Sequence, residues 1–106
     1  DYESAYVNAS KESCSSLDEL NTVTVTSNYP LAVINVIVKD SYGNSTVVEK
    51  KMFSGVNDGP PKEFALSELK NLKSYDDLGY PKGGCKVEIE VVVSTGERFT
   101  PVTLTF

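Results

Sequence analysis

The residues of this chain that could do chemistry lack the neighbours that catalysis requires. None of the 106 residues is a histidine, so the commonest general base and metal ligand of proteins is missing. Asp76 and Asp77 form a carboxylate pair, but adjacent residues do not by themselves place two carboxylates across a substrate. Calcium loops carry acids at alternating positions, a pattern that is absent here. We interpret these acids as solvated loop residues, with calcium binding as the alternative. The sequence predicts no enzyme activity, no metal and no other cofactor.

Other motifs for chemistry are also missing from the sequence. Serine is plentiful, yet no G-x-S-x-G pattern occurs and no histidine exists to activate a serine. Neither of the glycine-rich phosphate loops, G-x-G-x-x-G and G-x-x-x-x-G-K-[ST], is present. The chain has 10 basic and 15 acidic residues, which gives a net charge of −5 and a pI near 4.6. Because an acidic chain repels phosphate backbones, the composition argues against nucleic-acid binding.

The two cysteines, Cys14 and Cys85, are 71 positions apart (85 − 14). This spacing matches neither a metal knuckle nor a C-x-x-C motif. Two interpretations stay open at this point: one disulfide in an oxidising compartment, or two buried free thiols in a reduced protein. A catalytic thiol would lack a histidine to activate it. A disulfide would close a loop of roughly 70 residues and contribute at most about 4 kcal/mol through chain entropy.

The composition is that of a single globular domain. Hydrophobic residues make up 40% of the chain and charged residues 24%, which is typical of globular proteins. No linker interrupts the sequence, so we expect one domain over residues 1–106. The longest apolar run, around residues 31–38, is broken by Asn35 and is too short to cross a bilayer. Because no signal peptide opens the chain, we expect a mature protein or an excised domain without membrane insertion.

Period-two alternation predicts strands along most of the chain. β-Branched residues alternate in "NTVTVTSNYP", which indicates a strand. The turn formers of "DSYGNS" predict a hairpin that joins residues 31–39 to residues 46–53. We also expect a first strand around residues 3–9 and a helical turn in "SSLDEL", capped by Ser15 or Ser16.

The last quarter of the chain reads as two strands joined by the turn "STGE". The segment "CKVEIEVVV" places Val87, Ile89 and Val91 on one face. In the strand that follows, Pro101 cannot donate to a ladder, so it requires a sheet edge or a bulge. Residues 63–73 leave two alternatives open, because their leucines fit either a strand followed by a turn or one face of a helix.

Six or seven short strands separated by turns predict an all-β fold, an antiparallel sandwich of about seven strands. The order "FALSELKNL", a polar loop and "GGCKVEIEVVVSTGERFTPVTLTF" resembles the last third of a fibronectin type III or related immunoglobulin-like domain. There, an E strand, a leucine-containing loop and an F strand precede a glycine-containing hairpin and a G strand. The resemblance covers about residues 20–106. The usual strand-B tryptophan is absent, with Val23 and Val25 in that strand, and Cys85 lies near the place of the usual F-strand tyrosine.

The resemblance implies which connections lie together. In such a sandwich the AB, CC′ and EF connections share one end and the BC, DE and FG connections share the other. Cys14 falls near the AB region and Cys85 at the start of strand F, so both belong at the same end. A disulfide needs Cα atoms within about 7 Å of each other, and this arrangement makes one possible. We therefore favour the Cys14–Cys85 disulfide over two free thiols.

The same arrangement predicts a candidate binding patch. Tyr42 belongs to the CC′ turn, and Tyr75 and Tyr80 belong to the EF loop together with Asp76 and Asp77. Loops on a rigid sandwich often carry recognition, so these residues could bind a sugar or a protein. The alternative is that the tyrosines pack locally over the disulfide end.

The predicted function is a non-catalytic module of a larger secreted or cell-surface protein, with an accessory or adhesion role. It would act as a spacer or a protein-interaction domain, with neighbouring modules or another protein as partners. A second hypothesis is a carbohydrate-binding module that uses the loop tyrosines, although the chain lacks tryptophan, the best platform for sugars. A third is a small secreted inhibitor that presents "NDGPPKE" as a protruding loop.

Overall fold

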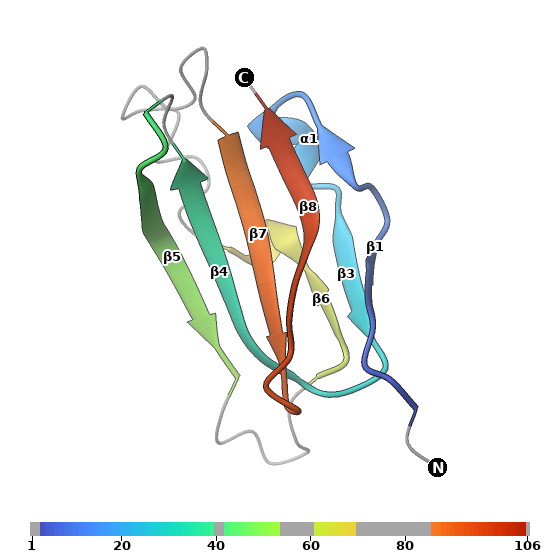
Figure 1. Cartoon of the computed structure of the whole chain (residues 1–106). Coiled ribbons are helices and arrows are strands. Elements are labelled where there is room, and N and C mark those ends of the chain that lie inside the picture. The colour runs from blue at the N-terminus through green and yellow to red at the C-terminus, as the bar shows by residue number, and fades with distance from the viewer. Residues whose placement is uncertain (1–2, 40–41, 54–60, 70–85, 106) are drawn as a thin grey trace.

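The computed structural model describes residues 3–39, 42–53, 61–69 and 86–105, and these residues form two β-sheets (Figure 1). The three-stranded sheet has the order β1 (Val7–Ala9), β3 (Thr24–Ser27), β6 (Glu63–Ala65). The five-stranded sheet has the order β2 (Ser13–Cys14), β8 (Arg98–Thr105), β7 (Lys86–Val93), β4 (Leu31–Lys39), β5 (Ser45–Met52). A short helix α1 (Leu17–Leu20) and a 3-10 turn η1 (Leu66–Glu68) complete the described elements. The predicted all-β composition is therefore confirmed.

The two sheets share one hydrophobic core. In β7 the predicted period-two face is buried: Val87, Ile89 and Val91 are at most 2% exposed, and the alternating residues between them are not buried. Val25 in β3 and Phe64 in β6 belong to the same core cluster from the other sheet. The ring of Phe53, just after β5, meets Phe64 edge-on with 5.3 Å between ring centroids, which joins the two sheets at their side.

The central hairpin forms as predicted. Strand β4 spans residues 31–39 as expected, and β5 spans 45–52 where 46–53 was expected. Gly43 in the connection has φ = +87°, a left-handed conformation that glycine adopts without steric cost. The register of the hairpin shifts between Val36 and Ile37, where β5 carries one extra residue, Val48.

Pro101 lies in a β-bulge, one of the two placements that the sequence allowed. Ile89 pairs with Val102 and Val91 pairs with Phe99, so Glu90 alone faces two residues of β8. The extra residue leaves backbone groups out of the ladder. The missing N–H of proline is therefore tolerated in the interior of the strand.

Residues 63–69 form a strand followed by a turn, which is the first of the two alternatives that the sequence left open. Glu63–Ala65 pair antiparallel with β3, with Phe64 opposite Val25. The 3-10 turn follows at once, and Leu69 N donates to Leu66 O at 3.1 Å. Pairing with β3 supplies the backbone partners that the local leucine spacing could not specify. Residues 70–73 lie outside the described residues.

The N-terminal segment departs from the expected single strand over residues 3–9. It forms β1, which pairs antiparallel with β3, and then crosses to the other sheet as β2, which pairs parallel with β8. The described residues thus contain eight strands where about seven were expected. The sheets were predicted to be antiparallel, but one pair of strands, β2 and β8, is parallel. Cys14 lies within β2, not in a loop. Two residues of pairing are too few to produce a recognisable sequence period, so the crossing was not predictable from the local pattern.

The shared core predicts that Ile89 is critical for stability. Its side chain is fully buried at the centre of β7, so Ile89→Ala should lower the free energy of unfolding by about 2–5 kcal/mol. Urea denaturation monitored by circular dichroism measures this change. The exposed Thr105→Ala on the neighbouring strand is the control and should shift the value by no more than about 0.5 kcal/mol. A loss below about 1 kcal/mol for Ile89→Ala would contradict this packing.

Candidate functional site

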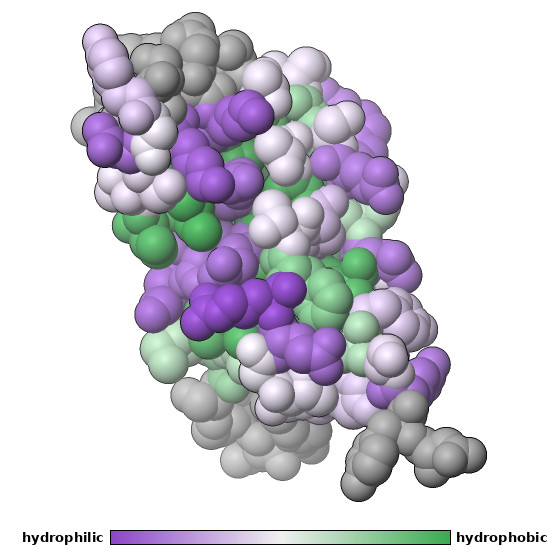
Figure 2. All heavy atoms as spheres, viewed as in Figure 1, coloured by the Kyte–Doolittle hydropathy of each residue, from purple (hydrophilic) through white to green (hydrophobic). Residues whose placement is uncertain are grey.

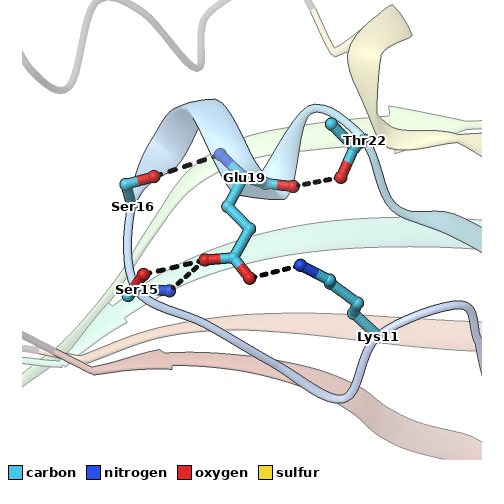
Figure 3. A network of polar contacts seen from close by, with 5 residues as sticks. All are labelled: Lys11, Ser15, Ser16, Glu19 and Thr22. Carbon is cyan, nitrogen blue, oxygen red and sulfur yellow. Dashed lines mark hydrogen bonds and ion pairs between the residues drawn. The ribbon is translucent and has the colours of Figure 1, made fainter.

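One polar cluster gathers around Glu19, and Figure 3 shows its members: Lys11, Ser15, Ser16, Glu19 and Thr22. The Glu19 carboxylate accepts from Lys11 Nζ at 2.5 Å and from both the backbone N–H and the Oγ of Ser15 at 2.8 Å. We call this cluster the Glu19 network. It connects the segment before β2 to α1, which follows β2. The network therefore holds the chain on both sides of the strand that contains Cys14.

The local sequence explains why this cluster forms. Ser16 Oγ accepts from the backbone N–H of Glu19 at 3.1 Å, which is the helix N-cap expected for this segment. At the other end of α1, Thr22 Oγ1 donates to the carbonyl of Glu19 at 2.7 Å. The spacing of Ser16 and Glu19 fits a capping box, except that the glutamate reaches Ser15 instead of the capping residue. The structure selects Ser16 as the cap and gives Ser15 a second role.

The Glu19 network stabilises the charged forms of Glu19 and Lys11 and does not prepare either group for proton transfer. The hydrogen bonds from Lys11 and Ser15 lower the pKa of Glu19 from 4.5 to about 2, because each of them favours the ionised carboxylate. The same pairing raises the pKa of Lys11. A carboxylate with so low a pKa is a poor general base at neutral pH, so the network has the properties of a structural cap.

Cys14 sits beside this network with its side chain in the core. It is 8% exposed and has no disulfide among the residues that the structure describes. Burial raises the pKa of the Cys14 thiol, and the nearby Glu19 charge raises it further. The thiol is thus held protonated and unreactive. Cys85 lies outside the described residues, so the pairing of the two cysteines stays a prediction.

The register nevertheless locates Cys14 relative to the beginning of β7. Cys14 lies opposite Leu104, and Leu104 lies opposite Val87. Cys14 therefore shares one row of the sheet with a residue near the start of β7. Cys14 and the start of β7 therefore lie at the same end of the five-stranded sheet.

The candidate tyrosine patch is described only at Tyr42. This side chain is 89% exposed in the connection between β4 and β5, the position that the sequence predicted for it. The other members of the patch, Tyr75, Asp76, Asp77 and Tyr80, lie outside the described residues. Whether the five residues come together therefore stays a prediction.

A second gathering of polar and apolar groups, which the sequence analysis did not single out, covers the five-stranded sheet on the side away from the core. Cross-strand register arranges these side chains in four rows, and we call them the outer face. The rows are Met52, Val33, Val92, Arg98; Lys50, Asn35, Glu90; Val47, Ile37, Glu88, Thr103; and Ser45, Lys39, Lys86, Thr105. The alternation in "KVEIEVVV" indicated which residues of β7 lie on this face. Only strand pairing determines which residues of β4 and β8 lie beside them.

Ion pairs run diagonally between these rows. Lys39 Nζ lies 2.9 Å from Glu88 Oε2, and Arg98 lies 2.9 Å from Glu90 Oε1. Asn35 Nδ2 donates to the same Glu90 oxygen at 3.0 Å. Because a carboxylate can only accept, this bond fixes which way the Asn35 amide points.

No protein-family model, curated protein or solved structure matches this chain. Within the described ranges, no group of three or more potential ligand residues could hold a metal ion. The helical part of those ranges contains no segment with the length and apolar character of a membrane span. Function must therefore be argued from the geometry of this chain alone.

The Glu19 network predicts a specific sensitivity to acid. Because the folded pKa of Glu19 lies below its ordinary value, its stabilising contribution is complete above about pH 4.5 and is lost as the pH falls towards 2. Glu19→Gln should therefore be less stable than the parent protein at pH 7, and the difference should shrink through this window. Thermal denaturation at a series of pH values measures it, with the exposed Glu97→Gln as the matched control. A difference that stays constant down to pH 2 would refute the network.

Proposed function

We propose that this chain is an immunoglobulin-like β-sandwich that serves as a non-catalytic spacer or protein-interaction module in a larger secreted or cell-surface protein. The proposal begins with the strand order. In the expected immunoglobulin-like pattern, E, F and G correspond to β6, β7 and β8. Strand β6 pairs with β3 in one sheet, and in the other sheet β7 pairs with both β8 and β4. This distribution supports the resemblance that the sequence suggested.

The observation that carries the spacer role is the arrangement of the second strand, β2, and the last strand, β8. Strand β2 runs parallel to β8, so the chain enters at one end of the sheets and leaves at the opposite end (Figure 1). The molecule measures 45 × 26 × 22 Å, and its strands follow the long direction. Modules with this geometry, joined in series, would form an extended rod.

The parallel pair also determines how such a rod would resist tension. Thr103 N donates to Glu12 O at 3.0 Å, across the direction in which a pull on the two ends would slide β2 past β8. Hydrogen bonds between parallel strands are slanted to the strand axes, but each of them still connects one strand to its neighbour. A force applied between the two chain ends therefore loads the bonds between β2 and β8 in shear. These bonds must then break together and not one after another.

Single-molecule pulling tests the spacer proposal. We expect a higher unfolding force when the protein is pulled through its two chain ends than when it is pulled through residue 42 and the C-terminal end. Strands β4 and β8 terminate at the same end of the sheet, so a pull between residue 42 and the C-terminal end opens the sheet strand by strand. Thr103→Pro, which removes the bond to Glu12, should lower only the end-to-end force. Equal forces in both geometries would overturn the proposal.

We extend the proposal to the Cys14–Cys85 disulfide, which would suit a protein of the extracellular space. Support comes from the position of Cys14, which is buried at the end of the sheet where β7 begins, with β8 between the two strands. Protein prepared without reductant should gain about 2 Da on reduction, and the reduced form should be less stable by at most about 4 kcal/mol. Two free thiols in protein never exposed to reductant would contradict both the bond and the secreted location.

A carbohydrate-binding role is the second candidate, and the exposure of Tyr42 favours it. An exposed aromatic ring on a short turn of a rigid sheet can stack against a sugar. The proposal needs Tyr75 and Tyr80 beside it, as the sequence predicts. The inhibitor hypothesis depends on the segment "NDGPPKE", most of which lies outside the described residues.

A further inference from the structure

The outer face carries positive charge although the chain is acidic. Over the described residues the face holds four cations and two carboxylates, a sum of +2. The whole chain sums to 10 − 15 = −5, so all other residues together carry −7. A face whose sign opposes that of the molecule steers and orients partners of the opposite charge. The charged residues are Lys39, Lys50, Lys86, Arg98, Glu88 and Glu90.

Two of these cations are available to a partner. Lys39 and Arg98 are neutralised by Glu88 and Glu90. Lys50 and Lys86 are exposed, and neither forms an ion pair with any described residue. They lie two strands and two rows apart, which places their Cα atoms roughly 17 Å from each other.

Two apolar side chains lie in the row between these two lysines: Val47, which is 53% exposed, and half-buried Ile37 beside it. Met52, which is 62% exposed, lies in the row on the other side of Lys50. Figure 2 shows apolar patches on this side of the molecule, separated by hydrophilic side chains. The outer face is thus a small apolar surface with one unpaired cation on either side.

The centre of the outer face contains a polar atom without a partner. Asn35 is 7% exposed, and its Oδ1 has no hydrogen bond although its Nδ2 binds Glu90. A buried acceptor without a donor destabilises the isolated fold, and an apolar residue of similar shape would avoid this cost. The amide therefore has the character of a group kept for recognition instead of stability.

We propose that the outer face docks an acidic protein segment, with two carboxylates paired to Lys50 and Lys86 and an apolar side chain seated on Val47 and Ile37. The inference deepens the interaction role in the proposed function, but it does not depend on the spacer geometry. Glu88 and Glu90 would repel a continuous polyanion such as a sulfated glycan, whereas a protein segment can place an apolar side chain beside them. The four rows span only about 14 by 20 Å, so the contact is weak and reversible compared with standard interfaces of about 800 Å² per partner.

The test uses a defined probe, the peptide acetyl-GETLTEG-amide. In an extended peptide its two glutamates and its leucine lie on one face, with the glutamate Cα atoms about 14 Å apart, within side-chain reach of the two lysines. Titration into the ¹⁵N-labelled protein should shift amide signals of β4, β5 and β7 and leave β3 and β6 unchanged. The glutamine peptide acetyl-GQTLTQG-amide should not bind. Binding should weaken between about 0.05 M and about 0.5 M salt.

Charge reversal identifies the face that binds. Lys50→Glu should weaken peptide binding by about tenfold or more, whereas Lys62→Glu, an exposed lysine just before β6 in the other sheet, should have no effect. The proposal is overturned by an absence of shifts at millimolar peptide, by equal effects of the two variants, or by preferential binding of a heparin oligosaccharide. Salt-sensitive dimerisation in sedimentation experiments, abolished by Lys50→Glu, would overturn it in favour of a second copy of the chain.

Asn35→Leu separates recognition from folding. The variant should raise Tm by several degrees, because it removes the unpaired acceptor, and it should weaken binding of the glutamate peptide. A lower Tm would show that the amide serves the fold, and unchanged peptide binding would remove it from the docking surface. This outcome is independent of the pulling experiment, so failure of the docking surface and failure of the spacer role can be told apart.

Discussion

The burial of one face of β4 and β7 between the two sheets is the constraint on which the rest of the structure depends. These strands lie side by side in the middle of the five-stranded sheet, and their buried rows pair Ile34 with Val91 and Val36 with Ile89. Burial of branched apolar side chains is the main favourable term in folding. Because side chains alternate along a strand, burying one set sends the other set to the opposite face. The polar order of the outer face is therefore a direct consequence of the core.

The N-terminal segment around β2 is held by a different kind of interaction. The segment of residues 10–22 has few apolar residues, and polar contacts position it: Lys11 and Ser15 bind Glu19, and Ser16 caps α1. These contacts are exposed, so each is weak by itself. Together they direct the chain from the three-stranded sheet to β8. The parallel pairing of β2 with β8, and with it the end-to-end path of the chain, depends on this short polar turn.

The outer face and the core make different demands on the same strands. The core requires close apolar packing, and β4 and β7 satisfy it fully. The outer face instead keeps an unpaired amide oxygen, two exposed apolar side chains on β5 and lysines without ionic partners among the described residues. Lys50 and Lys51, with the bulge at Val48, also suit the edge position of β5, because charge and irregular pairing oppose the addition of further strands. These features favour contact through the face of the sheet over contact through its edge.

The sequence by itself determined the elements whose pattern is local. The β4–β5 hairpin, the buried face of β7 and a helical turn capped by Ser15 or Ser16 follow from period-two alternation, turn residues and side-chain capping, each of which acts over a few neighbouring residues. Tertiary structure decided what depends on distant partners. Residues 63–65 are a strand because β3 supplies their hydrogen bonds, and β2 exists only because β8 lies beside it. The outer face joins Lys50, Asn35 and Glu90, which are far apart in sequence, through strand register. No local pattern can encode that register, because it is fixed by which strands share the core.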